Sequence, residues 1–98
     1  MSERRRVRVT EQFFGRLDEL LPAERTPSGE PSATDFLLHE MPPIIEKLAT
    51  DFEGTTMPTP SQPTVRALIA AGLLVPYLAV YVELAEDGSV EAFYLDIG

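Results

Sequence analysis

The sequence predicts an α+β fold in which an N-terminal strand and two to three helices precede a C-terminal antiparallel meander of three strands, in the order β-α-α-β-β-β. Three observations support this prediction. Apolar residues recur at helical spacing through the first half of the chain, and hydrophobic and polar residues alternate through the second half. Between two alternating segments stands Asp87-Gly88, a pair typical of β-hairpin turns. We expect the N-terminal strand to join the meander and the helices to cover one face of the sheet, because only one side of the closing hairpin is apolar.

The first strand and the first helix are predicted near the N-terminus. From Arg4 to Val9, charge alternates with Val7 and Val9, which is the pattern of a half-buried strand. Thr10 is then expected to cap a helix, because its side-chain oxygen can accept a hydrogen bond from the first turn. The apolar side of this helix comprises Phe13, Leu17, Leu20 and Leu21. Pro22 ends the helix, and the proline-rich residues 22–31 are expected to form a loop.

A second helical region is predicted after this loop. Ser32 and Asp35 have the spacing of a capping box, in which each side chain bonds to the backbone N–H of the other residue. Apolar residues then recur at helical spacing until about Glu53, and Gly54 is expected to cap the end of the helix.

Prolines set the other boundaries of this region. The Pro42-Pro43 pair removes two backbone donors and disfavours helix at the residue before it. We therefore expect two short helices that meet at a bend, with a boundary near Met41. A second proline-rich loop is expected at residues 55–63.

The alternating half of the chain predicts three strands, at residues 64–70, 73–85 and 89–97. Pro76 falls inside the second of them and cannot donate a ladder hydrogen bond. We therefore expect a bulge or an unpaired stretch near the start of that strand.

A two-residue loop at Asp87-Gly88 sets the register of the last hairpin and places Glu86 opposite Ser89. The side chains expected to face the helices are Leu78, Val80 and Val82, opposite Ile97, Leu95 and Phe93. Tyr81 is expected opposite Tyr94 on the other face, with Tyr77, Glu83 and Asp96 nearby. These tyrosines either cover the second face of a thin sheet or form a partner-binding face, since tyrosine is enriched at protein interfaces.

Arg66 is a lone arginine in an apolar strand. We expect it to form an ion pair with an acid such as Asp96 or Glu83. A catalytic cation is the less common alternative for such a residue.

The charge balance bears on the class of partner. Sixteen acidic residues against eight basic ones give a net charge of −8, which argues against a nucleic-acid partner, because phosphate binding needs clustered cations. Four of the eight cations lie near the N-terminus, at Arg4, Arg5, Arg6 and Arg8. These four arginines could contact nucleic acid or an acidic partner, and Arg4, Arg6 and Arg8 are the candidate contacts at the strand edge. Their more usual role is to prevent edge-to-edge aggregation.

Several kinds of chemistry lack support in the residues. The chain has no cysteine and a single histidine, His39, so neither thiolate catalysis nor a metal site is expected, and no cofactor. No serine stands in the glycine context of a nucleophile. No apolar run approaches the length of a membrane span, and residues 1–6 lack the hydrophobic stretch of a secretory signal, so a cytoplasmic location is expected.

The closing hairpin, Tyr81-Val82-Glu83-Leu84 to Asp87-Gly88-Ser89-Val90 and Tyr94-Leu95-Asp96-Ile97, resembles the RelE/ParE superfamily of small bacterial toxins. The strand Thr64-Val65-Arg66-Ala67-Leu68, the opening Val7-Arg8-Val9-Thr10 and the order of elements are also similar to that family. The resemblance implies an antitoxin partner, and a target that is ribosome-bound mRNA in one branch and DNA gyrase in the other. It also implies that Arg66 matches a recurring strand arginine and that Tyr94 lies near a functional aromatic.

The sequence departs from this family in three respects, one of which is a longer loop and the Pro42-Pro43 break in the helical region. Members that cut RNA are basic, whereas this chain carries −8, and Pro76-Tyr77-Leu78 stands where a second arginine usually follows. We therefore expect residues 1–98 to form one RelE/ParE-like domain that acts by protein–protein binding and has no catalytic residue. The expected binding surface comprises Arg66, Tyr77, Tyr81 and Tyr94. The partner is an antitoxin, another protein or a second copy of the chain, and the alternative function is an active toxin.

Overall fold

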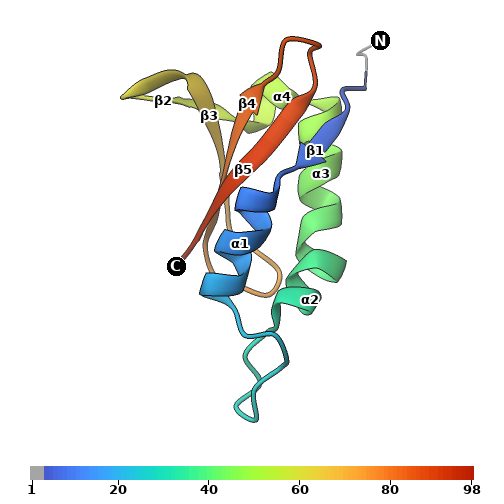
Figure 1. Cartoon of the computed structure of the whole chain (residues 1–98), viewed down its shortest axis with the longest axis vertical. Coiled ribbons are helices and arrows are strands. Elements are labelled where there is room, and N and C mark those ends of the chain that lie inside the picture. The colour runs from blue at the N-terminus through green and yellow to red at the C-terminus, as the bar shows by residue number, and fades with distance from the viewer. Residues whose placement is uncertain (1–3) are drawn as a thin grey trace.

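The computed structural model describes residues 4–98 as a single β-sheet with helices against one of its faces (Figure 1). The strands are β1 (Val7–Val9), β2 (Met57–Thr59), β3 (Gln62–Ala70), β4 (Leu78–Leu84) and β5 (Val90–Ile97). The helical segments are α1 (Glu11–Leu20), α2 (Ala33–Asp35), the π-helical turn η1 (Phe36–Glu40), α3 (Met41–Thr50) and α4 (Phe52–Thr55). The structure does not describe residues 1–3. These residues belong to the expected domain of residues 1–98 and to the N-terminal segment that was expected to lack a secretory signal.

The predicted α+β class is confirmed, but the sheet is larger than the predicted meander. Its order is β1-β5-β4-β3-β2, and β3, β4 and β5 form the antiparallel meander. Strand β1 joins β5 in parallel, with Val7 opposite Val90. The helices between β1 and the meander provide the long connection that a parallel pair requires.

Strand β2 lies where a loop was predicted at residues 55–63. Met57 pairs with Ala67 and Pro58 with Arg66, which adds a fifth strand at the edge of the sheet. Proline is tolerated at an edge, because its missing donor need not face a neighbouring strand. Three residues that include a proline carry no strand pattern of their own, so only the pairing with β3 reveals this strand.

The turn between β4 and β5 differs from the predicted two-residue loop. Only Gly88 has positive φ there, at 84°, and its N–H donates to the carbonyl of Ala85 at 2.9 Å. Ala85 in turn donates to the carbonyl of Ser89 at 2.8 Å, so Ser89 faces Ala85 and not Glu86. This geometry is that of a three-residue loop closed by a left-handed glycine. Asp87 instead accepts hydrogen bonds from the backbone N–H and the hydroxyl of Ser89.

A β-bulge in β5 compensates for this longer loop. Close to the turn Val82 pairs with Ala92, one residue away from the predicted partner Phe93. The register then shifts between Tyr81 and Val82, and Tyr81 pairs with Tyr94 as predicted. Phe93 is therefore the extra residue of the bulge and is partly exposed, whereas Ala92 takes the buried position.

The capping box predicted at the start of the second helical region is present. Asp35 N–H donates to the Ser32 hydroxyl, and Ser32 N–H donates to the Asp35 carboxylate, both at 3.0 Å. The predicted boundary at Met41 is the first residue of α3, but the chain does not break there. Met41 N–H donates to the carbonyl of Phe36, five residues back, so a π-helical turn carries the helix into the two prolines.

The end of this region differs from the prediction. Helix α3 ends at Thr50, and the single turn α4 follows it. Gly54 lies inside α4 and does not cap a helix.

The hydrophobic core lies between the sheet and the helices, on what we call the inner face of the sheet. The predicted inward residues Leu78, Val80, Val82 and Leu95 are all buried. They belong to the same cluster as Phe13 and Leu17 of α1, Phe36 of η1 and Ile44 and Leu48 of α3. Each such side chain contributes roughly 1.5–3 kcal/mol when it leaves water, so this layer orients the whole sheet.

The connection from β3 to β4 is held by the buried carboxylate of Glu40. Its two oxygens accept hydrogen bonds from the backbone N–H groups of Leu73 and Leu74, at 2.7 and 2.8 Å. Strand β4 accordingly begins at Leu78, five residues later than the predicted strand. Pro76 lies in the segment before it, so the predicted unpaired stretch is confirmed.

Candidate functional site

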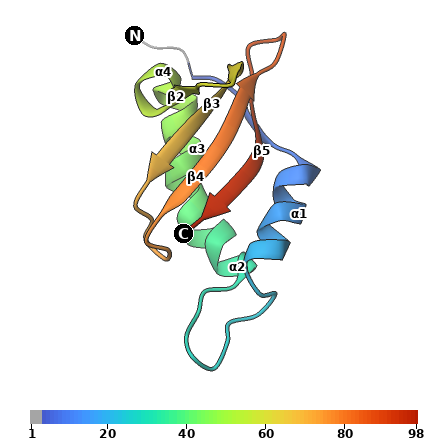
Figure 2. The same cartoon turned by 90° about the vertical axis from the view of Figure 1, so that its left-hand side faces the viewer.

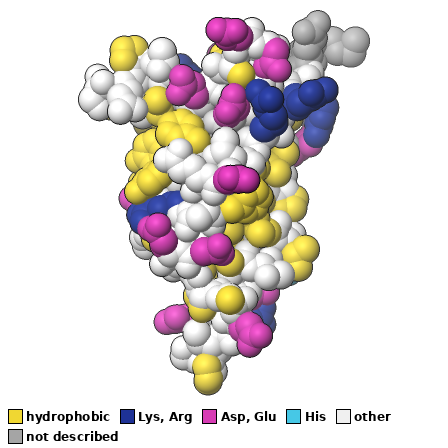
Figure 3. All heavy atoms as spheres, viewed as in Figure 1, with side chains coloured by type: hydrophobic (Ala, Val, Ile, Leu, Met, Phe, Trp, Pro, Cys, Tyr) yellow, Lys and Arg dark blue, Asp and Glu magenta, His cyan; other side chains and the backbone are white. Residues whose placement is uncertain are grey.

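The face of the sheet opposite the core carries no helix within residues 4–98 (Figure 2). We call it the outer face. The space-filling view shows hydrophobic side chains reaching the surface on the left, over the strands, with acidic side chains among them (Figure 3). An uncovered sheet face is where side chains remain free to contact a partner.

Four residues form a continuous row across the outer face. Met57 pairs with Ala67, Ala67 with Tyr81, and Tyr81 with Tyr94. Paired residues of antiparallel strands point to the same side of a sheet, so one row joins four strands. We call these four residues the tyrosine row. Met57 is 53% exposed, and both tyrosines are partly exposed.

The two tyrosines contact each other directly. Their ring centres lie 5.8 Å apart, with an angle of 66° between the ring planes. This edge-to-face arrangement is favoured by the quadrupoles of the two rings. The sequence prediction that Tyr81 and Tyr94 share the face opposite the core is confirmed.

Tyr77 lies at one end of the same face. Its carbonyl accepts a hydrogen bond from Gly98 N–H at 3.1 Å, which extends the pairing of β4 with β5 by one residue pair. Tyr77 is 41% exposed. Ile69, paired with the fully buried Ala79, is 45% exposed and lies between Tyr77 and the tyrosine row.

Arg66 does not belong to this surface. It pairs with the buried Val82 and therefore points toward the inner face. Its guanidinium donates to the hydroxyl of Thr56 at 2.7 Å and to the carbonyl of Thr56 at 2.8 Å, and lies 5.7 Å from the centre of the Phe52 ring. Neither predicted acidic partner of Arg66 is bonded to it. The structure therefore does not bring Arg66 together with Tyr77, Tyr81 and Tyr94, as the predicted binding surface required.

A second row beside the tyrosine row carries negative charge. Val65 pairs with Glu83, Glu83 with Glu91, and Glu91 with Arg8 of β1. Glu83 and Glu91 line an open pocket of about 560 Å³, together with Glu86 of the turn, Leu84 and Phe93. We call these five residues the glutamate pocket. Ala85 and two residues at the start of α1, Thr10 and Gln12, complete its lining. Sequence reasoning missed this pocket, because Phe93 was placed on the inner face; the outward position of Glu83 was the available signal.

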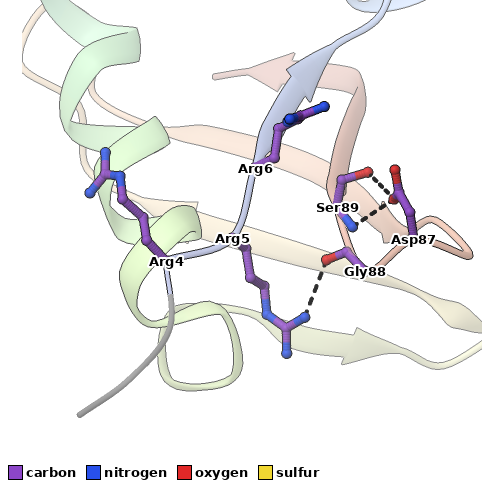
Figure 4. A pocket seen from close by; sticks show the side chains of 6 residues that line it. All are labelled: Arg4, Arg5, Arg6, Asp87, Gly88 and Ser89. Carbon is purple, nitrogen blue, oxygen red and sulfur yellow. Dashed lines mark hydrogen bonds between the residues drawn. The ribbon is translucent and has the colours of Figure 1, made fainter.

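The N-terminal arginines lie at the other side of the turn, where basic side chains gather in Figure 3. Arg4, Arg5 and Arg6 line a pocket of about 440 Å³ with Asp87, Gly88 and Ser89. Their three side chains point away from one another (Figure 4). They therefore do not converge on a single anion.

Acidic residues already neutralise several of these cations. Arg4 makes a double hydrogen bond to Glu46, at 2.8 and 2.6 Å, which holds the pKa of Glu46 below its usual value. Arg5 pairs with Glu53, and Arg8 with Glu91. The hydrogen bonds from Ser89 likewise lower the pKa of Asp87. These contacts are compatible with a structural role for the arginines.

In residues 4–98, no three His, Cys, Asp or Glu side chains come close enough together to hold a metal ion. His39 is exposed on η1. None of the helices in this part combines the length and the apolar character needed to cross a membrane.

Comparison with protein-family models, with curated proteins and with solved structures finds no match to this chain.

Proposed function

We propose that this chain is a small RelE/ParE-like protein that acts by binding another protein through the outer face of its sheet, without catalysis. The observation that carries the proposal is the tyrosine row, which lies uncovered across four strands. Tyrosine is enriched at protein interfaces, because its ring buries a large apolar area while its hydroxyl keeps a polar partner.

The shape of the outer face supports a role in binding another protein. Ala67 and Ala79 are buried, at 3% and 0% exposure, because their small side chains lie between larger neighbours. Tyr81 and Tyr94 lie beside these two buried alanines, and Met57, which is 53% exposed, lies at the end of the tyrosine row. Methionine adapts its shape to a partner, since its side chain is unbranched and flexible. The surface thus combines two rigid aromatic rings with a flexible methionine at its edge.

The electrostatics of the same face support a non-catalytic role. A nuclease must place cations beside the phosphates of its substrate. The outer face carries Glu83, Glu91 and Asp96. The cations that reach this face, Arg8 and Arg16, are paired with acids of the chain. Arg66 is bonded to Thr56 on the inner face. The alternative of an active toxin, either a ribosome-dependent mRNA endoribonuclease or a DNA gyrase inhibitor, therefore has less support.

A capture experiment tests the proposed surface. The wild-type chain, a double variant Met57→Ser/Tyr81→Ser and a control variant Leu38→Ser are immobilised and exposed to extract from the native organism. Leu38 is 63% exposed on η1, in the helical layer, so the control also removes an exposed apolar side chain. We expect at least one protein to be retained by the wild type and by the control and lost from the double variant. Equal retention by all three chains would contradict the proposal.

Induction in a bacterium separates binding from toxicity. If the chain is a non-catalytic binding protein, cells continue to grow and their mRNA remains intact. Growth arrest with cleaved mRNA, or with inhibited gyrase, would favour the active-toxin alternative.

A further inference from the structure

The glutamate pocket brings three acidic side chains together, and within residues 4–98 only one of them is paired with a cation. Glu83 and Glu91 are direct cross-strand partners, and Glu86 lines the same pocket from the turn. Like charges directly opposite each other destabilise a sheet, in contrast to opposite charges at the same positions. A cation beside Glu83 and Glu86 would offset the charge that Arg8 leaves unpaired.

The chain itself supplies little of this positive charge. Arg8 lies 3.2 Å from Glu91 and is the one cation paired with any of the three glutamates within residues 4–98. Glu83 and Glu86 are exposed and make no ion pair in that part of the chain. Two carboxylates therefore remain available to a ligand.

The pocket also offers an aromatic and apolar surface beside the carboxylates. Phe93 is present there because the bulge in β5 removes it from the inner face. Leu84, 41% exposed, lines the same pocket. A guanidinium or ammonium group is attracted both to the face of an aromatic ring and to carboxylates, and its methylene stem packs on apolar side chains.

We propose that the glutamate pocket receives an arginine or lysine side chain of the protein partner, whose neighbouring apolar residues cover the tyrosine row. This inference rests on the proposed function and specifies the chemistry of the partner: a basic, amphipathic segment. Glu83 follows Tyr81 by two residues on β4, which separates the two subsites by roughly 6–7 Å. Positions three or four apart on a helix have a similar spacing, about 5–6 Å.

Charge complementarity selects such a partner over a second copy of the chain. A two-fold dimer through the outer face would bring two copies of the same acidic surface together. The basic N-terminal residues of a second copy are a poorer source of the cation, since Arg4, Arg5 and Arg8 already pair with acids of their own chain.

Synthetic peptides test the inference. One short amphipathic peptide carries arginines on one side and leucines on the other, and a second carries the neutral analogue citrulline in place of each arginine. Backbone amide resonances of the chain are followed by NMR during titration. We expect the arginine peptide to shift the amides of Glu83, Glu91, Phe93, Tyr81 and Tyr94, and to bind about tenfold more tightly than the citrulline peptide.

Matched charge variants identify the subsite. Glu83→Gln/Glu86→Gln is expected to weaken the arginine peptide about tenfold. The control Glu24→Gln/Glu30→Gln changes the net charge equally, but at two exposed positions in the loop before α2, and should leave the affinity within about twofold. An equal loss in both variants would show an effect of net charge alone and would overturn the inference.

The remaining outcomes separate this inference from the proposed function. If both peptides bind the tyrosine row equally well, the cation subsite is overturned, whereas binding through the outer face survives. If neither peptide shifts the outer face, the basic-segment inference is overturned, and the capture experiment alone decides the proposed function.

Discussion

The guanidinium carbon of Arg16 lies 4.9 Å from the centre of the Tyr94 ring, which connects helix α1 to the outer face of the sheet. The same side chain donates from Nε to the carbonyl of Leu95 at 3.0 Å and approaches Asp96 at 3.4 Å. Strand β1 pairs only with Val90–Ala92, so this part of β5 lies beyond the end of its neighbour. Arg16 thus donates to the Leu95 carbonyl on the part of β5 that β1 does not reach, and it packs on Tyr94 of the candidate site.

Replacing Arg16 with alanine should therefore destabilise the fold and loosen the outer face. We expect the free energy of unfolding to fall by about 1–2 kcal/mol, because a charge-assisted hydrogen bond and a cation–π contact are both lost. Urea denaturation measures the change, and line widths of the Tyr94 ring resonances report its mobility. Arg25→Ala is the control, since Arg25 is exposed and forms its ion pair with Asp35 of α2, not with β5, and should have a smaller effect. An unchanged Tyr94 signal in Arg16→Ala would contradict the support that we assign to Arg16.

Gly72 is expected to be intolerant of alanine because of Glu40. A Cβ atom at Gly72 would lie 2.7 Å from Oε2 of Glu40 and 2.7 Å from the carbonyl oxygen of Val75. The Glu40 carboxylate is held by two backbone donors, and the Val75 carbonyl belongs to the backbone, so neither can move freely. We expect Gly72→Ala to lower the free energy of unfolding by about 1–3 kcal/mol in urea denaturation.

Gly15→Ala is the matched control for this substitution. Gly15 is exposed inside α1, and an added Cβ meets no atom within 4 Å. The same chemical change should therefore stabilise the chain by about 0.5–1 kcal/mol, because alanine has the higher helix propensity. Equal effects of the two substitutions would show that Glu40 does not hold the loop as described.

The contact between Tyr81 and Tyr94 should appear as a coupling energy. In a double-mutant cycle of Tyr81→Ala and Tyr94→Ala, we expect the two rings to stabilise each other by about 0.5–1.5 kcal/mol. The cycle Tyr77→Ala with Tyr94→Ala provides a comparison on the same face and should give a smaller value, since no direct ring contact joins that pair. A coupling energy near zero for Tyr81 and Tyr94 would mean that the rings do not remain in contact in solution.

Asp35 should make the second helical region sensitive to acid. Hydrogen bonding from the Ser32 backbone, followed by that from Arg25, lowers the pKa of Asp35 from 3.8 to about 2. The folded chain thus binds this proton less readily than the unfolded chain. The contribution of the capping box is complete above about pH 4 and is lost as the pH falls toward about 2.

The variant Asp35→Asn should lack this acid-dependent loss. Urea denaturation between about pH 5 and pH 2 compares it with the wild type and with Asp18→Asn. Asp18 is exposed and makes no hydrogen bond or ion pair within the described chain, so its variant should retain the wild-type slope. Parallel pH dependences of the wild type and Asp35→Asn would refute the assignment.

The predicted pairing of Tyr81 with Tyr94 is correct although the predicted turn is wrong. The loop at Gly88 is one residue longer than expected, and the bulge at Phe93 shifts the register back. Local alternation determined which tyrosines point away from the core, but the turn type depends on the φ angle of Asp87, which the residue type does not dictate.

Arg66 shows what a period-two pattern can and cannot predict. Leu68 and Arg66 are two residues apart in one strand, so the burial of Leu68 on the inner face predicts the same direction for Arg66. The identity of its partner was not predictable in this way. Thr56 becomes available only because α4 and β2 bring it beside β3.

The sequence by itself determined the features that depend on neighbouring residues: the helical and alternating segments, the capping box of Ser32 and Asp35, the boundary at Met41 and the outward direction of the tyrosines. Tertiary structure alone decided the parallel pairing of β1 with β5, the addition of β2 and the hold of Glu40 on a distant loop. The physical reason is that caps and periodicity arise within a few residues of backbone, whereas strand pairing and charge neighbours arise when burial of a shared core brings remote segments together.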